Sequence, residues 1–382
     1  MMSLKRIYWP IFLFIILYHM AVLIGAPFYF YYTPPSWAMV VVSIVIFSLT
    51  GISITAGYHR LYSHRAYKTS KFIEVPLIFL GTMAGQGSIL RWANDHRLHH
   101  KHVDTDLDPY SIKKGFWHAH ILWLFEKRDP IIPGLVADLT KNKLIVFQDR
   151  FYNILFFLTN ALVSLAVGWW LNDFIGAFFL VWWVRLFAVH HSTWFINSLA
   201  HTWGSKSYYK ELSAVDNYLI SLLTFGEGYH NYHHYFASDY RNGIRWYHFD
   251  PTKWLIWTLH KTGLANNLKK FDEFRIKKQI LKNDKTLLTD RLVHLTHVKK
   301  EELEMKIKET FDSISLKMTE IRRLKEKYLQ FKNQDTSGKM IDDLKYEINK
   351  MQAKLSKDIK AWQDLFNGIM KLQPIPVRNT RR

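Results

Sequence analysis

The chain has 382 residues, of which 49% are hydrophobic, 16% are aromatic and none is cysteine. The lack of cysteine excludes disulfides, thiolate metal sites and thiol catalysis, and leaves histidine and carboxylate as the strong metal ligands. Lys and Arg outnumber Asp and Glu by 51 to 32, which suits anionic lipid or an anionic substrate; the cations are scattered and form no recognition motif for nucleic acid, so we expect no nucleic-acid partner.

Four apolar segments are long enough to cross a bilayer, which needs about 20 helical residues. A signal peptide is the alternative for the first segment, but its apolar part would be shorter. A further apolar stretch, 72–90, is predicted to lie in the membrane interface or to dip in and out of it, because a fifth span would put the later histidines on opposite sides. The predicted spans are residues 8–32, 37–56, 151–171 and 174–196.

The distribution of cations predicts the orientation of these spans. The short links between spans one and two and between spans three and four contain no Lys or Arg, whereas the N-terminus, the segment 57–150 and the chain after residue 197 are rich in them. By the positive-inside rule, both termini and both long segments face the cytoplasm. The lack of an organelle signal and the helical tail favour a bacterial inner membrane.

Eight of the 19 histidines fall into three short motifs: HRLYSH at 59–64, HRLHH at 96–100 and HNYHH at 230–234. The HxxHH spacing puts its three imidazoles on one side of a helix. Neutral imidazole suits iron, copper, nickel and zinc, and eight ligands exceed the needs of one ion, so two metal ions are expected. The HExxH motif of zinc hydrolases and the Glu-rich motifs of soluble di-iron bundles are missing. An all-histidine site of two metals beside a membrane favours redox chemistry on a lipidic substrate.

The stretches HRLYSH, DHRLHHKHVDTDLDP, NSLAH and GEGYHNYHH resemble the histidine boxes of the stearoyl-CoA (delta-9) desaturase family over roughly residues 40–270. The resemblance implies an all-α integral membrane fold, with four transmembrane helices under a cytosolic helical cap that carries a di-iron site. It also implies oxygen-dependent insertion of a cis double bond, expected at the delta-9 position, into a saturated acyl chain carried on CoA or a lipid. The ligand set implied for the two Fe ions is His59, His64, His96, His99, His100, His201, His230, His233 and His234, with Asn197 acting through a water.

The resemblance also implies substrate contacts. Three residues would line the bend of an acyl tunnel, two would form its closed end, and cations would bind CoA phosphates. Asn94 stands where animal acyl-CoA members carry Arg, which keeps an acyl-lipid substrate open. The predicted contacts at the bend of the tunnel are Gln86, Trp92 and Trp194. Those at its closed end are Phe47 and Thr50. The cations predicted to bind CoA phosphates are Lys127 and Arg128, with Lys113 and Lys114 also available.

Further residues near the motifs have two interpretations. Five carboxylates are either partners of the ring N–H groups or ordinary loop caps and ion pairs; they are Asp95, Asp104, Asp106, Asp108 and Glu227. Five histidines lie outside the matched positions and are expected to be structural, with His191 the first candidate for an exception; they are His102, His118, His120, His190 and His191.

The C-terminal third carries apolar residues at steps of three or four, interrupted by a turn signal at 335–338. This pattern predicts a helical hairpin or coiled coil. Packing against the rest of the chain, oligomerisation, docking of an electron donor and binding of anionic headgroups all remain open for it. The expected organisation is a desaturase domain over 1–275, a linker over 276–298, the hairpin over 299–372 and a basic tail over 373–382.

The expected partners are O2, membrane lipid and a separate electron donor, either a ferredoxin or cytochrome b5 with its reductase, because no fused haem-binding motif is visible. A membrane di-iron fatty-acyl or alkane hydroxylase is the nearest alternative. A metal-handling membrane protein is an alternative of another class, but it would hold its ligands within the spans near the midplane. Here the predicted ligands lie at or beyond the span ends.

Overall fold

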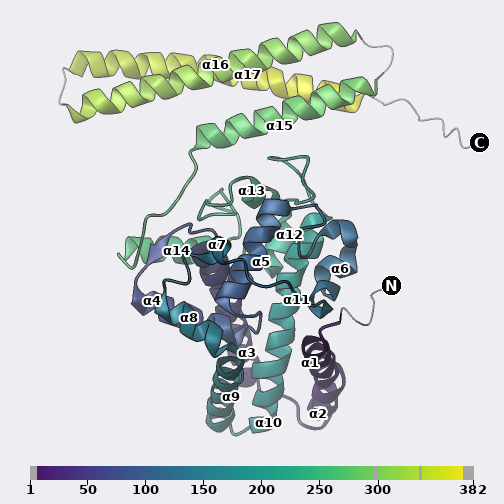
Figure 1. Cartoon of the computed structure of the whole chain (residues 1–382). Helices are drawn as coiled ribbons and strands as arrows, with labels where there is room; N and C mark the ends of the chain where they lie inside the picture. The colour runs from purple at the N-terminus through teal and green to yellow at the C-terminus, as the bar shows by residue number, and fades with distance from the viewer. Residues whose placement is uncertain (1–6, 296–298, 335–337, 373–382) are drawn as a thin grey trace, which may run out of the picture. The chain divides into compact units, whose positions relative to one another are not determined.

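The computed structural model describes residues 7–295, 299–334 and 338–372, and these are almost entirely helical (Figure 1). The chain divides into two compact units, Met1–Lys270 and Phe271–Arg382. The predicted all-α fold is confirmed. The basic tail expected over 373–382 and the turn expected at 335–337 lie outside the described residues.

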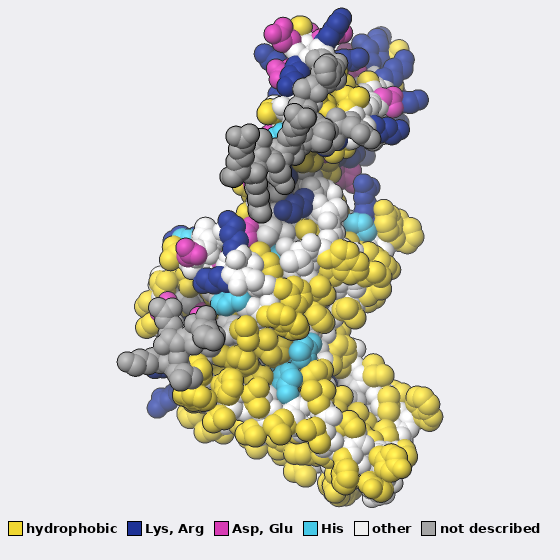
Figure 2. Space-filling model, turned by 90° about the vertical axis from the view of Figure 1, so that its right-hand side faces the viewer, with side chains coloured by type: hydrophobic (Ala, Val, Ile, Leu, Met, Phe, Trp, Pro, Cys, Tyr) yellow, Lys and Arg dark blue, Asp and Glu magenta, His cyan; other side chains and the backbone are white. Residues whose placement is uncertain are grey.

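In the described residues of the first unit, four helical segments are long and apolar enough to cross a membrane, with mean hydropathy from 1.5 to 2.3. The second and fourth run past their apolar stretches and carry predicted metal ligands near their ends, His59 and His201. Hydrophobic side chains cover the surface of this region (Figure 2). The segments are Trp9–Tyr32 (α1 Trp9–Met20, η2 Ala21–Gly25, α2 Ala26–Tyr32), Trp37–Ser63 (α3 Trp37–Ser53, η3 Ile54–Ser63), Tyr152–Leu171 (α9) and Phe174–His201 (α10 Phe174–Ala177, η6 Phe178–Val184, α11 Arg185–Ser198, η7 Leu199–His201).

Capping residues explain where these helices begin and end. The Ser36 hydroxyl accepts a hydrogen bond from Met39 N at 3.2 Å and starts α3. Asn172 adopts a left-handed conformation, φ 53°, that ends α9, and Asp173 accepts from Gly176 N at 2.7 Å to start α10. Two residues therefore suffice to reverse the chain between the third and fourth spans.

Shorter elements gather at one end of the spanning helices, opposite α2 and α10 (Figure 1). The stretch predicted to lie in the interface contains α4, whose 13 residues are too few to span the bilayer. The elements are β1 (Lys68–Thr69), α4 (Lys71–Met83), α5 (Ile89–His102), η4 (Ile112–Lys114), α6 (Phe116–His120), η5 (Leu122–Phe125), α7 (Pro133–Val136), α8 (Lys143–Arg150), α12 (Tyr218–Leu223), α13 (His230–Tyr235), α14 (Pro251–Lys261) and β2 (Ala265–Asn266), which pairs antiparallel with β1.

The second unit consists of α15 (Glu273–Val293), α16 (Lys300–Asn333) and α17 (Gly338–Lys371). Ile307 of α16 shares a buried cluster with Ile369 of α17, and Leu324 shares another with Leu344, so the two long helices pack antiparallel as the hairpin prediction requires. In place of the linker expected over 276–298, the structure has most of α15, because its leucines are buried in the same core as the hairpin. The division into functional domains stays a prediction.

Candidate metal centre

The first ligand motif lies on a π-helical segment, η3, in which nine of ten residues are buried. Such segments are rare and frequent at functional sites. Arg60, next to His59, is 1% exposed, and its guanidinium is 3.0 Å from a carboxylate oxygen of Glu227 and 3.0 Å from one of Asp250. The two carboxylates neutralise the buried Arg60 guanidinium. They also fix η3 against the loops on either side of α13, since Glu227 precedes that helix and Asp250 follows it.

All nine predicted histidine ligands come together in two groups, and within each group one ring nitrogen from every member lies within 4.8 Å of the others. Helix α5 contributes two residues to the first group and one to the second, whereas α13 does the reverse. The i and i+4 residues of each HxxHH motif share a group, and the i+3 residue turns to the other. The first group is His59, His64, His96, His100 and His233, and the second is His99, His201, His230 and His234.

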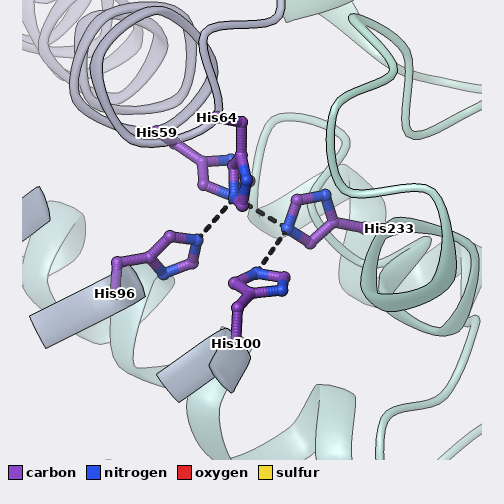
Figure 3. Close-up of side chains that lie close together, drawn as sticks. All are labelled: His59, His64, His96, His100 and His233. Atoms are coloured by element: carbon purple, nitrogen blue, oxygen red, sulfur yellow. Dashed lines mark hydrogen bonds between the residues drawn. The ribbon is translucent and has the colours of Figure 1, made fainter. Parts of the chain in front are cut away.

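The distances between the Nε2 atoms fit shared metal ions. In the first group, His64 and His96 are 2.8 Å apart (Figure 3). His233 is 3.0 Å from both His59 and His100. Two nitrogens that each lie about 2.1 Å from one ion, at right angles, are about 3.0 Å apart.

The second group has the same spacing. His230 Nε2 lies 3.1 Å from His201 Nε2 and 3.0 Å from His234 Nε2, and the distance between the Nε2 atoms of His99 and His234 is 3.2 Å. Two groups of converging imidazoles are therefore able to hold two metal ions.

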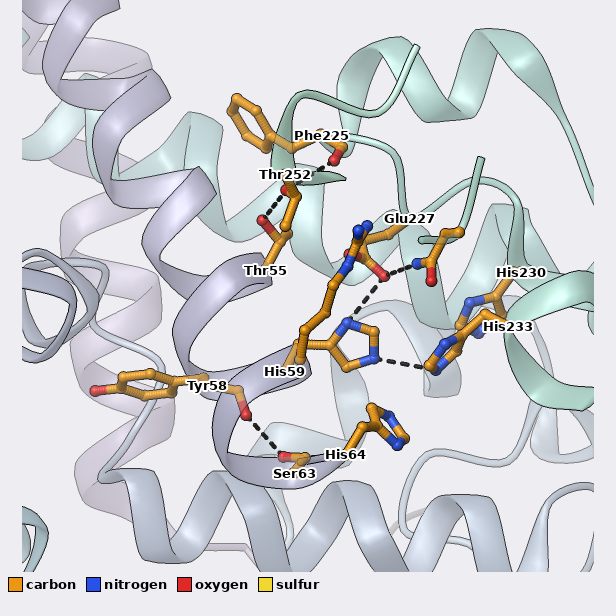
Figure 4. A network of polar contacts seen from close by, with 12 residues as sticks. Thr55, Tyr58, His59, Ser63, His64, Phe225, Glu227, His230, His233 and Thr252 are labelled. Atoms are coloured by element: carbon orange, nitrogen blue, oxygen red, sulfur yellow. Dashed lines mark hydrogen bonds and ion pairs between the residues drawn. The ribbon is translucent and has the colours of Figure 1, made fainter. Parts of the chain in front are cut away.

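A carboxylate, directly or through a serine, orients three of these rings through their Nδ1 atoms. Glu227 Oε2 lies 3.0 Å from His59 Nδ1 (Figure 4), and Asp108 Oδ1 lies 2.9 Å from His99 Nδ1. His201 Nδ1 is 2.6 Å from Ser213 Oγ, which donates to Asp104 Oδ1 at 2.5 Å. A proton held on Nδ1 leaves the Nε2 lone pair free for a metal.

Three of the five carboxylates expected beside the histidines thus reach them, one through a serine. Asp95 instead pairs with Arg91 and Arg128, and Asp106 is exposed. Sequence reasoning missed Ser213, and it missed Tyr110, whose hydroxyl lies 3.3 Å from His96 Nδ1. Neither residue belongs to a motif, so only the folded chain brings them to the site.

Burial favours the neutral form of six of these histidines, because a charged imidazole is poorly solvated inside the protein. It lowers the pKa well below the ordinary value for His64, His96, His100, His230, His233 and His234. Burial opposes ionisation of Glu227, but His59 and Arg60 outweigh it and hold the pKa of that carboxyl below its usual range. The site therefore combines neutral imidazole donors with an ionised carboxylate.

A cavity of about 480 Å³ connects both histidine groups to apolar space between α1, α9 and α11. Gln86, Trp92 and Trp194, which the resemblance assigns to an acyl tunnel, line this cavity, and so does Asn197. Gln86 Nε2 donates to Thr193 Oγ1 at 2.7 Å, and Trp92 Nε1 donates to Gln86 Oε1 at 3.3 Å. These polar contacts lie where the wall passes from the histidines to the apolar part.

The other predicted substrate contacts are placed differently. Arg128 lines the cavity, but Lys127 is exposed and is not among the lining residues described. Phe47 packs on Phe225, with ring centroids 5.3 Å apart, and Thr50 Oγ1 donates to Ile46 O at 2.8 Å. Neither of these two residues is among the described lining, so their assignment to the closed end stays a prediction.

The remaining histidines lie outside both groups. His191 links two others: its Nε2 is 3.2 Å from His19 Nε2, and its Nδ1 is 3.1 Å from His120 Nε2. Because these contacts use both ring nitrogens of His191, the three rings form a chain rather than converge on one point. His190 lies 2.9 Å from the Tyr18 hydroxyl. The structural roles expected for His120 and His190, and the exception considered for His191, stay predictions.

Comparison with known proteins gives a consistent result. The family model described as "Fatty acid desaturase" matches residues 35–265. A "Probable acyl-CoA desaturase" of Schizosaccharomyces pombe is 42% identical over 71% of this chain and 58% of its own length. "Acyl-CoA desaturase 1" of Saccharomyces cerevisiae is 38% identical over 63% of this chain and 48% of its own length. The "sn-1 stearoyl-lipid 9-desaturase" of Anabaena variabilis is 35% identical over 67% of this chain and 93% of its own length.

The match therefore spans only about half the length of the two yeast proteins, and the family model ends before the C-terminal unit begins. The match to the family model and the four candidate spans together show that this chain is a multi-pass membrane protein.

Proposed function

Because the chain belongs to the fatty acid desaturase family, we propose that it inserts a cis double bond, at the delta-9 position, into a saturated acyl chain carried on CoA or a lipid. The observation that supports this most directly is the cavity, which has members of both histidine groups in its wall and continues between apolar side chains. His59 and His96 belong to the first group, and His99 and His230 belong to the second. An acyl chain in this cavity would pass both groups.

We propose that the two groups hold two iron ions, with the nine histidines as ligands and Asn197 acting through a water. When bound, the iron pair would supply the oxidising power that breaking an unactivated methylene C–H bond requires. The residues of this chain would bind the metal ions and the acyl chain and orient them toward each other. Glu227, Asp108 and Ser213 fix the imidazole rings, and the apolar wall excludes water and confines the chain. Gln86 and Thr193 provide a polar contact beside the histidines.

The remaining parts of the proposal concern the surroundings of the site. Both termini and the histidine groups face the cytoplasm, in a bacterial inner membrane. O2 and two electrons from a separate donor, a ferredoxin or cytochrome b5 with its reductase, complete the reaction. Membrane lipid surrounds the spans, and self-association through the C-terminal helices stays a prediction.

Fatty-acid profiling of an expressing host tests the proposed activity. We expect new cis-monounsaturated chains with the wild type and none with the His99→Ala, His233→Ala double variant, which removes one ligand from each group. His102→Ala is the matched control, because this residue lies on the same helix outside both groups and should leave the products unchanged.

Two further readouts separate the alternatives. Hydroxylated acyl chains in place of unsaturated ones would show that the protein is a hydroxylase. Metal analysis of the purified protein should give two irons per chain in the wild type and in His102→Ala. A stable content of another metal, without new fatty acids, would contradict the proposal.

A further inference from the structure

A line of aromatic rings connects the protein surface to the second histidine group. Trp246 is 87% exposed, and its ring centroid lies 5.7 Å from that of Tyr247, which is itself 60% exposed. Tyr247 lies 5.1 Å from His248, and His248 stacks on Tyr229 at 4.5 Å with an angle of 11° between the rings. Tyr229 directly precedes His230, so the line ends at a member of the second group.

The loop that carries the outer rings is held in place from below. Lys253 Nζ donates to three of its backbone carbonyls, those of Gly243 at 2.6 Å, Arg245 at 2.9 Å and His248 at 3.3 Å. A lysine that satisfies all three of its donors on one loop fixes the path of that loop. Because the loop is anchored in this way, Trp246 is held in its exposed position.

Backbone contacts join the same loop to the metal centre. Asp250 accepts from the backbone N–H of Asn242 at 2.9 Å and of Gly243 at 3.0 Å, and it also pairs with Arg60. The Asn242 amide donates to Glu227 Oε2 at 2.5 Å. A Cβ on Gly243 would come within 2.7 Å of His248 Cβ and 2.9 Å of the Tyr229 ring, so glycine permits the stack. The loop and the oxygen partner of His59 form one buried framework.

Trp246 and Tyr247 are large aromatic residues exposed side by side on this anchored loop, and Trp, Tyr and Arg are the residues that dominate protein–protein contacts. Arg245, next to Trp246, is exposed. We propose that Trp246, Tyr247 and Arg245 form the docking surface for a small acidic one-electron carrier protein, and that Tyr247, His248 and Tyr229 conduct its electron to the second histidine group. The proposal rests on the proposed function, because only a redox centre needs such a path.

The electron balance sets what this surface must do in each turnover. O2 takes up four electrons and four protons to become two water molecules. The substrate loses two electrons and two protons as two C–H bonds break and one C=C bond forms. Two electrons come from the carrier, which is oxidised in two successive one-electron encounters, and two protons come from solvent. The surface therefore has to bind reduced carrier and release it oxidised, so a modest, salt-sensitive affinity is expected.

Binding is tested first, without any reaction. The metal-free protein in nanodiscs is titrated with a labelled plant-type ferredoxin and, separately, with the soluble domain of cytochrome b5. We expect Trp246→Ala to raise Kd by about tenfold, as removal of a central aromatic anchor does. Arg245→Glu should weaken binding most at low salt. Trp117→Ala is the matched control, since this tryptophan is 66% exposed and lies outside the aromatic line.

Electron transfer is tested next with the iron-loaded protein, by stopped-flow reoxidation of the reduced carrier at saturating concentration. At a carrier concentration that saturates each variant, Tyr247→Leu should lose most of the reoxidation rate, whereas Tyr247→Phe, which keeps the ring, should retain it. Reduction by dithionite and the iron content should stay at wild-type levels in every variant. This pattern separates conduction from damage to the metal centre.

Three results would overturn the proposal. The first is unchanged Kd and reoxidation rate in both Trp246→Ala and Tyr247→Leu. The second is an equal loss of rate with dithionite and with the carrier. The third is unchanged carrier binding by Trp246→Ala together with a loss, relative to the wild type, of tryptophan fluorescence quenching by brominated anionic phospholipid, which would place this residue at the membrane surface. A wild type that oxidises carrier through this surface but forms no unsaturated product would instead contradict the proposed function.

Discussion

At the scale of single residues, Asp108 is a direct test of how the rings are oriented. It accepts from His99 Nδ1 at 2.9 Å and also from the backbone N–H of Tyr110 at 3.2 Å. Asp108→Asn keeps the shape of the side chain but removes its charge. Losing such a partner weakens metal binding by about 10- to 100-fold. If the proposed iron centre holds, we expect this drop when iron is removed by a competing chelator, with the helix content unchanged.

Asp106→Asn is the control for this experiment. Asp106 is exposed and lies two residues away, so its substitution should leave iron affinity unchanged. Equal losses in the two variants would show that the effect comes from the charge of the loop rather than from the contact with His99.

The histidine motifs also show what a sequence reveals at this scale. Spacing singled out the six histidines of the two HxxHH motifs, because i, i+3 and i+4 positions share one side of a helix, whereas the full set of nine, His201 included, was expected from the resemblance. It did not divide them between two groups, because that depends on how α5 and α13 face each other. His99 belongs to the second group although the other two motif histidines of α5 belong to the first, and His233 of α13 belongs to the first group although its two neighbours belong to the second. Ser213 could not be predicted at all, since its contact depends on a loop.

At the scale of elements, the helices α5 and α13 make the metal-free protein sensitive to acid. Unfolded histidines take up protons near pH 6.5, whereas burial holds the pKa of His64, His96, His100, His230, His233 and His234 well below that value in the fold. As the pH falls below about 6.5, the unfolded chain binds more protons, so the free energy of unfolding decreases.

Thermal unfolding of the metal-free protein at pH 8, 7 and 6 measures this effect. We expect the midpoint to change little between pH 8 and 7 and to fall at pH 6. The C-terminal unit, which contains none of these residues, provides the control. A midpoint that stays constant down to pH 6 would contradict neutral, buried imidazoles.

The first span supplies a second prediction at this scale. Phe14 of α1 lines the cavity, and its ring lies 5.9 Å from Phe156 and 6.1 Å from Trp183. Phe14→Ala would remove part of the apolar wall and enlarge the space for an acyl chain. If the proposed function holds, the products should shift toward longer acyl chains, as measured by gas chromatography.

Phe47→Ala is the matched comparison, because the resemblance alone placed this residue at the closed end of the tunnel. Its ring packs on Phe225, and it is not among the described lining residues. A shift in chain length with Phe47→Ala and none with Phe14→Ala would favour the assignment made from the resemblance over the cavity seen in the structure.

At the scale of the whole molecule, hydropathy predicted the spans, because a bilayer requires about 20 apolar residues and few soluble elements have so many. The same patterning missed α15. Its 21 residues are mostly polar or charged, and the leucines that bury it are spaced widely among them. Such a helix is recognised only when the two partners that cover its apolar side are known, and so a linker was predicted where the third helix of a bundle lies.

The three C-terminal helices have a core of their own, which leads to a prediction about the isolated unit. Trp362 is 2% exposed; its Nε1 donates to Asp284 Oδ2 at 3.3 Å, and it packs in one cluster with Leu288, Ile314 and Met318. Residues 271–382 expressed alone should therefore unfold cooperatively. Trp362→Ala should lower the free energy of unfolding by about 3–5 kcal/mol, as measured by urea denaturation followed by circular dichroism.

Tyr346→Ala is the control, since this side chain is 67% exposed and should change the free energy of unfolding by no more than about 0.5 kcal/mol. In the full chain, Trp362→Ala should leave the iron content unchanged, because both histidine groups lie within the first unit. If the isolated unit did not fold, or if iron were lost from the full chain, the two units would depend on each other. Independent folding of this unit, with the iron content of the full chain retained, would instead show that the proposed metal centre does not depend on the C-terminal core.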